Sequence, residues 1–336
     1  MKGYRVNRRS VLIGMAATPS IIRAARAASI TLRLSSSLPN NPKFANGRVY
    51  YDNLVMRLAA NGLADRIDVQ FFPDNQLGQE IDVVNSVSLG VIDLMVTGTS
   101  IWANVVPLIG LLDLGYLFES FPQQTKALDA GAARPLEQAL KAGANVHIIG
   151  WAYNFGSRSV LCKSPVKAPA DLAGKRIRTL PNKIITECLR LMGAAATPLA
   201  FGEIYTALQA GVLDGLEHDP PTIVASKFYE TAKFYSLTQH NFSALGVFCS
   251  GLTLNRMEEA LRDQFLTAAA EAAMETRARG LEAEKDAMET LKQKGVEIIA
   301  CDREPFRKLA LPQTDEFVRA HPEAKPIIDI VRSAKA

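Results

Sequence analysis

Residues 198–215 read Pro-Leu-Ala-Phe-Gly-Glu-Ile-Tyr-Thr-Ala-Leu-Gln-Ala-Gly-Val-Leu-Asp-Gly, and this stretch indicates the fold most directly. Residues 203–210 have the apolar spacing of an amphipathic helix. Gly211 suits the left-handed position that ends a helix, and Asp214 begins a short strand-like run. The strand would lead to a polar tip, Glu217-His218-Asp219. Because ligands collect at the carboxyl ends of parallel strands, this order predicts an α/β sheet with a ligand at its edge.

The same pattern occurs once more, earlier in the chain. Gly90 and Asp93 precede Gly211 and Asp214 by one common offset, 211 − 90 = 121 positions. The repeat predicts two lobes that are built alike, with a second polar tip at residues 97–100 bordering the same crevice. A coincidence of two common helix–strand turns is the alternative.

Length and composition agree with two folded lobes. The chain has 336 residues, more than one small core usually holds, with 48% apolar and 21% charged residues. Its formal charge of +4 suggests a nucleic-acid partner, but residues 1–27 hold six basic and no acidic residues. The remainder has 38 − 6 = 32 basic against 34 acidic residues, which removes the basis for a surface that binds phosphates. We therefore expect no nucleic-acid partner.

Residues 1–27 have the features of an export signal. A basic start is followed by the apolar run 11–17 and by small residues at 25–27 that suit cleavage. The sequence around Arg8 and Arg9 resembles a twin-arginine signal. No stretch reaches the ~20 apolar residues of a membrane span. These features predict a periplasmic protein, and a disordered N-terminal arm is the alternative.

The cysteines give little evidence of metal or redox chemistry. Their spacing contains no C-x-x-C pair, which argues against a zinc ribbon or a thioredoxin-type site. Buried free thiols are expected, although one or two disulfides remain possible in an oxidising compartment. The four are Cys162, Cys188, Cys249 and Cys301.

Strand-like and helical segments alternate along the chain, as an α/β fold requires. Strands are predicted at residues 30–34, 67–72, 94–96, 146–149, 159–162, 175–179 and 296–300. Helices are predicted at residues 48–63, 80–89, 123–131, 135–142, 183–192, 203–210 and 306–320.

A single long helix is predicted between residues 256 and 294. The segment has no proline and one glycine, Gly280, and Asn255 with Glu258 suggests a capping box at its start. At ~1.5 Å per residue it could exceed about 50 Å, which is longer than one lobe. We therefore expect it to pack across both lobes; a coiled-coil dimer is the alternative, but no heptad repeat is sustained.

Taken together, these segments resemble one family, the solute-binding proteins of tripartite ATP-independent periplasmic (TRAP) transporters, of the type that binds C4-dicarboxylates or sialic acid. The resemblance covers nearly the whole chain after residue 28. It lies in residues 72–80, 90–93, 174–178 and 198–215 and in the long helix.

The resemblance implies a two-lobed periplasmic binding protein fold of the α/β class, with crossing strands and a long helix that spans both lobes. The expected lobes are residues 29–155 with 244–283, and 156–243 with 284–336. It also implies a monomer that captures a small organic acid anion (sugar acid, hydroxy acid or dicarboxylate) and delivers it to the membrane subunits of a TRAP transporter. No catalytic residue, metal or cofactor is expected.

Two arginines are the main candidates for the ligand site. By resemblance, Arg178 holds the ligand carboxylate and Arg158 supports the same site. The chemistry fits, because a planar guanidinium donates two parallel hydrogen bonds to a carboxylate. Ordinary surface ion pairs are the alternative. Phe201 occupies the family's aromatic position against the ligand, although a core phenylalanine would look the same.

The two polar tips supply the remaining candidates. His218 and Asp219 stand where a sialic acid binder has Asn and Pro, which argues against sialic acid and for hydroxyl recognition. The contacts expected from the opposite lobe are Asn41, Thr99, Ser100 and Trp102.

Two other functions remain open. Glu217, His218 and Asp219 could form a metal-assisted enzyme site that acts on a carboxylate, although three consecutive side chains rarely converge on one ion. A periplasmic sensor that presents its ligand to a membrane receptor is the second.

Overall fold

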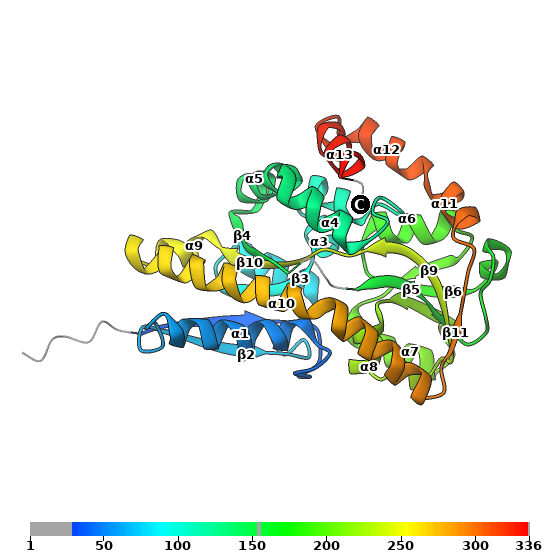
Figure 1. Ribbon diagram of the computed structural model, residues 1–336, viewed down its shortest axis with the longest axis horizontal. Helices are drawn as coiled ribbons and strands as arrows, with labels where there is room; N and C mark the ends of the chain where they lie inside the picture. Colours follow the sequence, from blue (N-terminus) through cyan, green and yellow to red (C-terminus); the bar gives the residue numbers. More distant parts are fainter. Residues whose placement is uncertain (1–28, 153–155, 335–336) are drawn as a thin grey trace, which may run out of the picture.

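The computed structural model describes residues 29–152 and 156–334, in two α/β lobes (Figure 1). The predicted export signal, residues 1–27, lies outside the described residues. The first lobe has a five-stranded sheet of order β2-β1-β3-β10-β4, and the second has a six-stranded sheet of order β11-β9-β5-β8-β6-β7. The first sheet contains β1 (Ile30–Ser35), β2 (Ile67–Phe72), β3 (Leu94–Gly98), β4 (Val146–Trp151) and β10 (Leu245–Ser250). The second contains β5 (Ser157–Cys162), β6 (Arg176–Thr179), β7 (Ala195–Pro198), β8 (Gly215–His218), β9 (Phe234–Phe242) and β11 (Glu297–Ile299).

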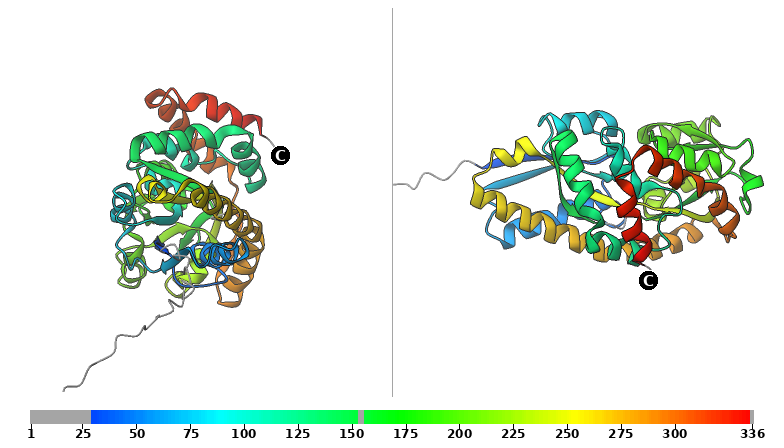
Figure 2. Two further views of the ribbon diagram at one scale, coloured as in Figure 1. Left: turned by 90° about the vertical axis from the view of Figure 1, so that its left-hand side faces the viewer. Right: turned by 90° about the horizontal axis from the view of Figure 1, so that it is seen from above.

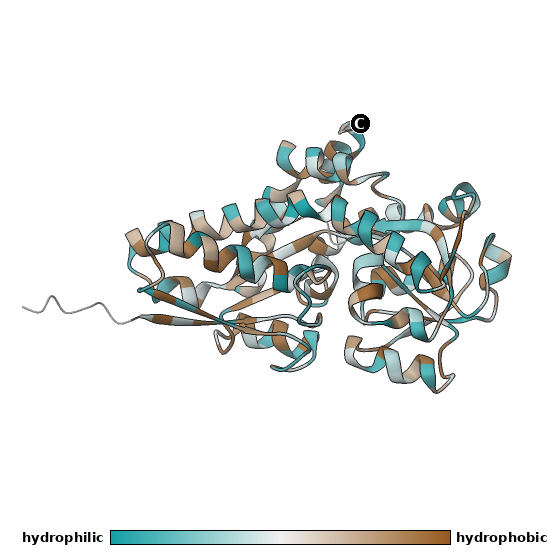
Figure 3. Ribbon diagram, turned by 60° about the horizontal axis from the view of Figure 1, so that its bottom comes forward, coloured by the Kyte–Doolittle hydropathy of each residue, from teal (hydrophilic) through white to brown (hydrophobic). Residues whose placement is uncertain are grey.

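Helices cover both sheets, and apolar residues concentrate on the strands inside each lobe (Figure 3). The first lobe carries α1 (Asn46–Ala60), α2 (Glu80–Ser88), α3 (Thr99–Trp102), η1 (Pro107–Asp113), α4 (Phe121–Ala127), a π-helical turn (Leu128–Ala132), α5 (Ala133–Ala144) and α9 (Gly251–Asn255). The second carries η3 (Pro169–Leu172), α6 (Lys183–Leu191), η4 (Phe201–Glu203), α7 (Ile204–Gln209), α8 (Pro220–Ala225) and η5 (Phe228–Glu230). The chain continues through α10 (Glu259–Gln293), α11 (Glu304–Ala310), α12 (Pro312–Ala320) and α13 (Ala324–Ser333).

The chain changes from one sheet to the other three times: from β4 to β5, from β9 to β10, and along α10 to β11. Helix α10 packs against α1 and β4 in the first lobe and against α8 and β11 in the second. Figure 1 shows it running along both lobes. The predicted α/β fold with two lobes, crossing strands and a spanning helix is therefore confirmed.

The long helix begins later than predicted. It starts at Glu259, with Glu258 at the N-cap and no side-chain capping bond, whereas Asn255 is the last residue of α9. The middle of its buried face is made of small residues where α10 packs on β4 and α1, namely Ala268, Ala269, Ala272 and Ala273.

The glycine–aspartate repeat has the same structure in both lobes. Gly90 and Gly211 have positive φ angles, +70° and +74°, at the ends of α2 and α7. Asp93 accepts the backbone N–H of Arg33 on the adjacent strand β1 at 2.8 Å. Asp214 does the same for Arg176 on β6 at 2.9 Å. In each sheet the aspartate therefore ties the start of its own strand to the neighbouring strand.

Other elements differ from the sequence prediction. The predicted helix 306–320 is two helices, α11 and α12, because Pro312 has no N–H to donate and starts a new helix. Strands β7, β9 and β10 and helix α13 were not predicted. Helix α13, which the predicted domain limits assign to the second lobe, packs against α4 and the π-helical turn (Figure 2). The residue limits of the lobes remain a prediction.

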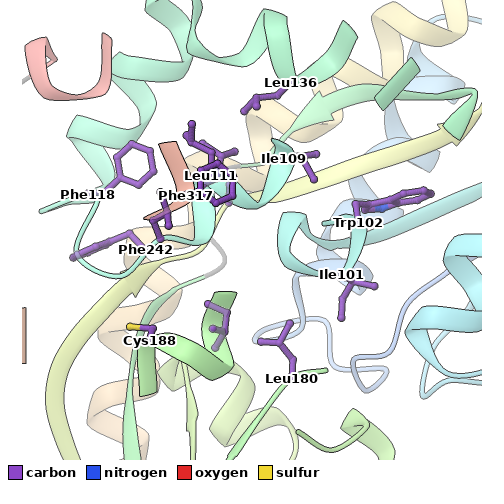
Figure 4. Packing of buried hydrophobic residues seen from close by; sticks show 14 of the residues in the cluster. Ile101, Trp102, Ile109, Leu111, Phe118, Leu136, Leu180, Cys188, Phe242 and Phe317 are labelled. Carbon is purple, nitrogen blue, oxygen red and sulfur yellow. The ribbon is translucent and has the colours of Figure 1, made fainter. Parts of the chain in front are cut away.

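One buried cluster continues from the first lobe into the second. Trp102 and Leu111 of the first lobe belong to the same cluster as Cys188 and Leu180 of the second (Figure 4). A Cβ on Gly110 would collide with Ile184 of α6, so glycine is needed where η1 meets α6. All four cysteines are free thiols. None of the helices formed by residues 29–152 and 156–334 has both the length and the hydropathy of a membrane span.

Candidate ligand-binding site between the lobes

A small cavity lies where the two sheets meet. The volume open to the centre of a water-sized sphere is about 20 Å³, enough for about one water molecule. The lining residues come from both lobes: Ser37, Leu38, Glu80, Thr97, Gly98, Ser100 and Ile101 from the first, and Arg158, Arg178, Leu180, Phe201 and His218 from the second. Five of these were predicted site residues: Ser100, Arg158, Arg178, Phe201 and His218.

Arg178 lies on β6 and is 1% exposed. Its Nε donates to the carbonyl oxygen of Leu199 at 2.9 Å, and its Nη2 has no hydrogen-bond partner among the described residues. Burial lowers the pKa of Arg178 to about 10, although the Glu217 carboxylate acts in the opposite direction. A guanidinium of that pKa keeps its proton at pH 7. Arg178 therefore brings a buried positive charge with an unused donor to the cavity wall.

Arg158, on β5, is already paired with a carboxylate. Its Nε lies 2.5 Å from Glu217 Oε2 and its Nη2 lies 2.7 Å from Oε1, so the pair is bidentate. Burial is the largest single effect on Glu217 and would raise its pKa, but the charge and hydrogen bonds of Arg158 and the nearby His240 together lower the pKa overall. His240 Nε2 stands 3.5 Å from Glu217 Oε2, at the outer limit of a hydrogen bond. The Arg158 charge is therefore largely cancelled within the second lobe.

His218 and Asp219 follow one another but face different surroundings. His218 lines the cavity, and burial lowers the pKa of its imidazole, with the Arg158 charge adding to the effect. A lowered pKa leaves this ring neutral at pH 7. Asp219 accepts the backbone N–H of Thr222 at 3.0 Å and caps α8. It also touches His218 Nδ1 at 2.5 Å, so Asp219 lies behind the histidine and orients it.

Phe201 closes one side of the cavity. Its ring lies edge-on to the rings of His218 and Phe228, with centroid distances of 5.8 Å for each. The ring is held by the short η4 turn at the start of α7, within the sequence segment that indicates the fold. Its partly buried position presents an apolar surface to the cavity.

The first-lobe wall is polar. Glu80 begins α2 and accepts the hydroxyl hydrogen of Thr97 at 2.7 Å. Ser37 follows β1, and Ser100 lies in α3 directly after β3. The wall therefore offers one carboxylate and several hydroxyls opposite Arg178.

Four predicted residues lie outside the cavity lining. Thr99 donates to Asp113 Oδ2 at 3.0 Å, and Trp102 packs on Phe248 in the core with ring centroids 5.0 Å apart. Asn41 accepts the backbone N–H groups of Lys43 and Phe44. The Asp219 carboxylate caps α8 through the backbone N–H of Thr222.

Several lining residues were not predicted from the sequence, and Glu80 is the most important of them. The signal was present, because Glu80 ends the family-like segment 72–80 and starts a predicted helix. Thr97 and Gly98 belong to the predicted polar tip but were not singled out. Leu38, Ile101 and Leu180 carry no sequence signal that separates them from core residues.

A second hollow of about 270 Å³ lies between α1 and α10. Its walls hold Lys43, Arg279, Glu282 and Asp286, and Lys43 Nζ pairs with Asp286 Oδ2 at 2.8 Å. These side chains are exposed and their charges balance, which distinguishes this hollow from the buried arginine site. No cluster of three or more metal-ligating side chains occurs in residues 29–152 and 156–334.

Comparison with known proteins gives a consistent result. The 2,3-diketo-L-gulonate-binding periplasmic protein of Escherichia coli is 30% identical over 267 residues, which cover 79% of this chain and 81% of that protein. A TRAP periplasmic solute binding protein from Xanthobacter autotrophicus Py2, solved with bound β-D-galacturonate, is 26% identical with a TM-score of 0.85. A TRAP periplasmic solute binding protein from Chromohalobacter salexigens, solved with bound D-glucuronate, is 27% identical with a TM-score of 0.84. Each structural match covers 90% of this chain and 100% of the other.

The family description that matches residues 53–320 is that of bacterial extracellular solute-binding protein, family 7. The match spans all three passages between the lobes and all the cavity residues after Leu38. The chain therefore belongs to bacterial extracellular solute-binding protein family 7 and is a solute-binding protein of the TRAP type.

Proposed function

We propose that this protein is a periplasmic receptor that holds one sugar-acid monoanion between its lobes and delivers it to the membrane subunits of a TRAP transporter. The observation that carries the proposal is Arg178, a buried guanidinium that faces the cavity with Nη2 unpartnered among the described residues. A carboxylate would accept from that group through charge-assisted hydrogen bonds. The carboxylate would also compensate a charge that the fold buries without a close counter-ion.

The balance of charge favours a ligand with a single carboxylate. Arg158 is neutralised by Glu217, so Arg178 is the arginine of the cavity wall that is left for an anion. Glu80 adds a carboxyl group on the opposite wall, where a second ligand carboxylate would meet a like charge. Among the sugar acids, hydroxy acids and dicarboxylates that the sequence left open, this arrangement disfavours dicarboxylates.

The remaining polar groups suit a ligand rich in hydroxyls. Glu80, Thr97, Ser100 and His218 offer hydroxyls, a carboxylate and a neutral imidazole around one small space. Such groups donate to and accept from sugar hydroxyls. The bound galacturonate and glucuronate of the two related structures point to the same chemical class.

Binding would require the lobes to move. A cavity of about 20 Å³ is far smaller than a six-carbon acid, so the ligand would enter as the lobes separate and would be enclosed as they close. We expect the lobes to hinge at the β9–β10 passage, where the chain leaves the second sheet and enters the first.

Two features argue against the metal-assisted enzyme alternative. The Glu217 carboxylate is paired with Arg158, and the Asp219 carboxylate caps the start of α8. The three consecutive side chains 217–219 therefore do not converge on one ion. A sensor would share the same ligand site and would differ only in its membrane partner, which a pull-down with TRAP membrane subunits would separate from transport.

A thermal-shift screen with a panel of carboxylates tests the proposal. D-Glucuronate or D-galacturonate at ~100 times its dissociation constant should stabilise the fold by about 2.7 kcal/mol. NMR of the recovered ligand should show it unchanged, as expected for a receptor. A protein that no acid in the panel stabilises, or that converts the acid, would contradict the proposed function.

A further inference from the structure

Two asparagine side chains join the lobes beside the cavity. Asn182, which precedes α6 in the second lobe, donates from Nδ2 to the carbonyl oxygen of Ser100 in the first lobe at 2.6 Å. Asn104, which follows α3 in the first lobe, donates from Nδ2 to the carbonyl oxygen of Pro181 at 3.0 Å. The contact is therefore reciprocal, with one amide and one carbonyl from each lobe.

The two hydrogen bonds stand next to residues that line the cavity. Ser100 itself and its neighbour Ile101 line the first-lobe wall, and Leu180 lies two residues before Asn182 on the opposite wall. Asn182 is 4% exposed, whereas Asn104 is exposed to solvent. One bond is thus shielded and the other lies at the rim, and neither side chain lines the cavity.

Asn182 also caps a helix within its own lobe. Its Oδ1 accepts the backbone N–H groups of Ile184 and Ile185 at 2.8 and 2.9 Å and so caps α6. The cap fixes the rotamer, and the remaining Nδ2 then points at Ser100. The donor is consequently preorganised before the lobes meet, and closing them costs little side-chain entropy.

We propose that Asn104 and Asn182 form an asparagine clasp, which is made when the lobes close and which raises ligand affinity without touching the ligand. The inference rests on the proposed function, since it assumes that ligand binding and closure are coupled. Each hydrogen bond stabilises the closed arrangement, so losing one should increase the rate at which the lobes reopen. Both residues are positioning residues, and the effect should lie in the dissociation rate rather than the association rate.

The chain offers variants that separate the clasp from helix capping. Asn182→Ser keeps an N-cap oxygen for α6 but removes the amide that reaches Ser100. Asn104→Ala removes the rim bond at an exposed site. Gln70→Ala is the matched control, because Gln70 is an exposed amide that bonds only within the first lobe, to Asp68.

Calorimetry and stopped-flow measurements with D-glucuronate test the clasp. Asn182→Ser and Asn104→Ala should each weaken binding about threefold to tenfold, mainly by faster dissociation, and this loss should exceed any loss of stability of the ligand-free variants relative to Gln70→Ala. Wild-type affinity in both variants, or a loss of affinity matched by an equal loss of ligand-free stability, would overturn the inference.

A wild-type protein that binds neither D-glucuronate nor any other acid would contradict the proposed function instead. In that case small-angle scattering decides the clasp on the ligand-free proteins. The clasp predicts a larger radius of gyration for the Asn104→Ala, Asn182→Ser double variant than for wild type, and equal radii would overturn it.

Discussion

Arg158 and Glu217 form a buried bidentate ion pair, with Nε to Oε2 at 2.5 Å and Nη2 to Oε1 at 2.7 Å. Arg178 lies two strands away in the same sheet, since β8 separates β5 from β6, and it has no such partner among the described residues. The two arginines of the site therefore have different roles. One is fixed by the protein's own carboxylate, and the other is left to the ligand.

The first prediction concerns Glu217→Gln. The change keeps the shape of the side chain but leaves the Arg158 charge buried without compensation, which should cost about 3 to 5 kcal/mol of unfolding free energy at pH 7. Because the pKa of Glu217 is lowered in the fold, its stabilising effect is present above the unfolded value and is lost as the pH falls below about 4.5. Urea unfolding of both proteins at several pH values measures this, and equal stability at pH 7 would contradict it.

The second prediction concerns Asp113, whose effect on stability has the opposite pH dependence to that of Glu217. Burial raises the pKa of Asp113 to about 7, and its Oδ1 has no partner among the described residues. The folded protein therefore holds this proton while the unfolded chain releases it, so stability falls as the pH rises from about 4 to 7. The unfolding free energy of Asp113→Asn should rise relative to that of wild type as the pH increases from about 4 to 7, by roughly 4 kcal/mol at most. Above pH ~7 the difference between the two proteins should stay constant. Thermal melts from pH 5 to 8 provide the check; a constant difference would argue against it.

The third prediction concerns Glu80 and ligand charge. D-Glucarate carries a second carboxylate, which would face Glu80. It is also an open chain where D-glucuronate is mainly a pyranose ring, so the Glu80→Gln variant is needed to isolate the effect of charge. We expect wild type to bind D-glucuronate at least about tenfold more tightly, from a repulsion of ~1.4 kcal/mol. Glu80→Gln should narrow this preference by removing the opposing charge. Competition calorimetry gives the ratio, and equal binding of both acids by wild type would refute the charge argument.

The fourth prediction concerns export. Arg8 and Arg9 lie in the segment that resembles a twin-arginine signal, outside the described residues. Replacing both with Lys should leave unprocessed precursor in the cytoplasm. Immunoblots of periplasmic and cytoplasmic fractions measure this, and a normal periplasmic yield would point to another export route.

Local sequence patterns predicted the parts of the fold that depend on local chemistry. Gly90 and Gly211 end helices and Asp93 and Asp214 fix the adjacent strands, as their types and spacing suggested. Strands β9 and β10 escaped detection. They are buried over most of their length because each lies between two other strands of its sheet, so they show no clear alternation of polar and apolar residues.

Arg178 was singled out because residues 174–178 resemble the family's motif, and the structure places it in the cavity wall. Its burial, which explains why its charge needs a partner, could not be read from the sequence. Trp102 was misjudged because an aromatic beside a polar tip can face either the cavity or the core, and packing on Phe248 decides between them. Asp219 was placed in the correct region, but its carboxylate caps α8, which depends on the start of that helix and not on the tip alone.

Calorimetry of Arg178 variants with D-glucuronate tests the central claim most directly. Arg178→Ala should lose about 3 kcal/mol or more of binding free energy, over ~100-fold in affinity, because the carboxylate loses its charge-assisted hydrogen bonds. Arg178→Lys keeps the charge without the planar fork and should also bind poorly. The ligand-free variants should melt close to wild type, since removing a buried charge with an unused donor offsets the loss of the Nε bond to Leu199. Near-wild-type affinity in an Arg178→Ala protein that melts normally would contradict the account and would move the carboxylate to another residue.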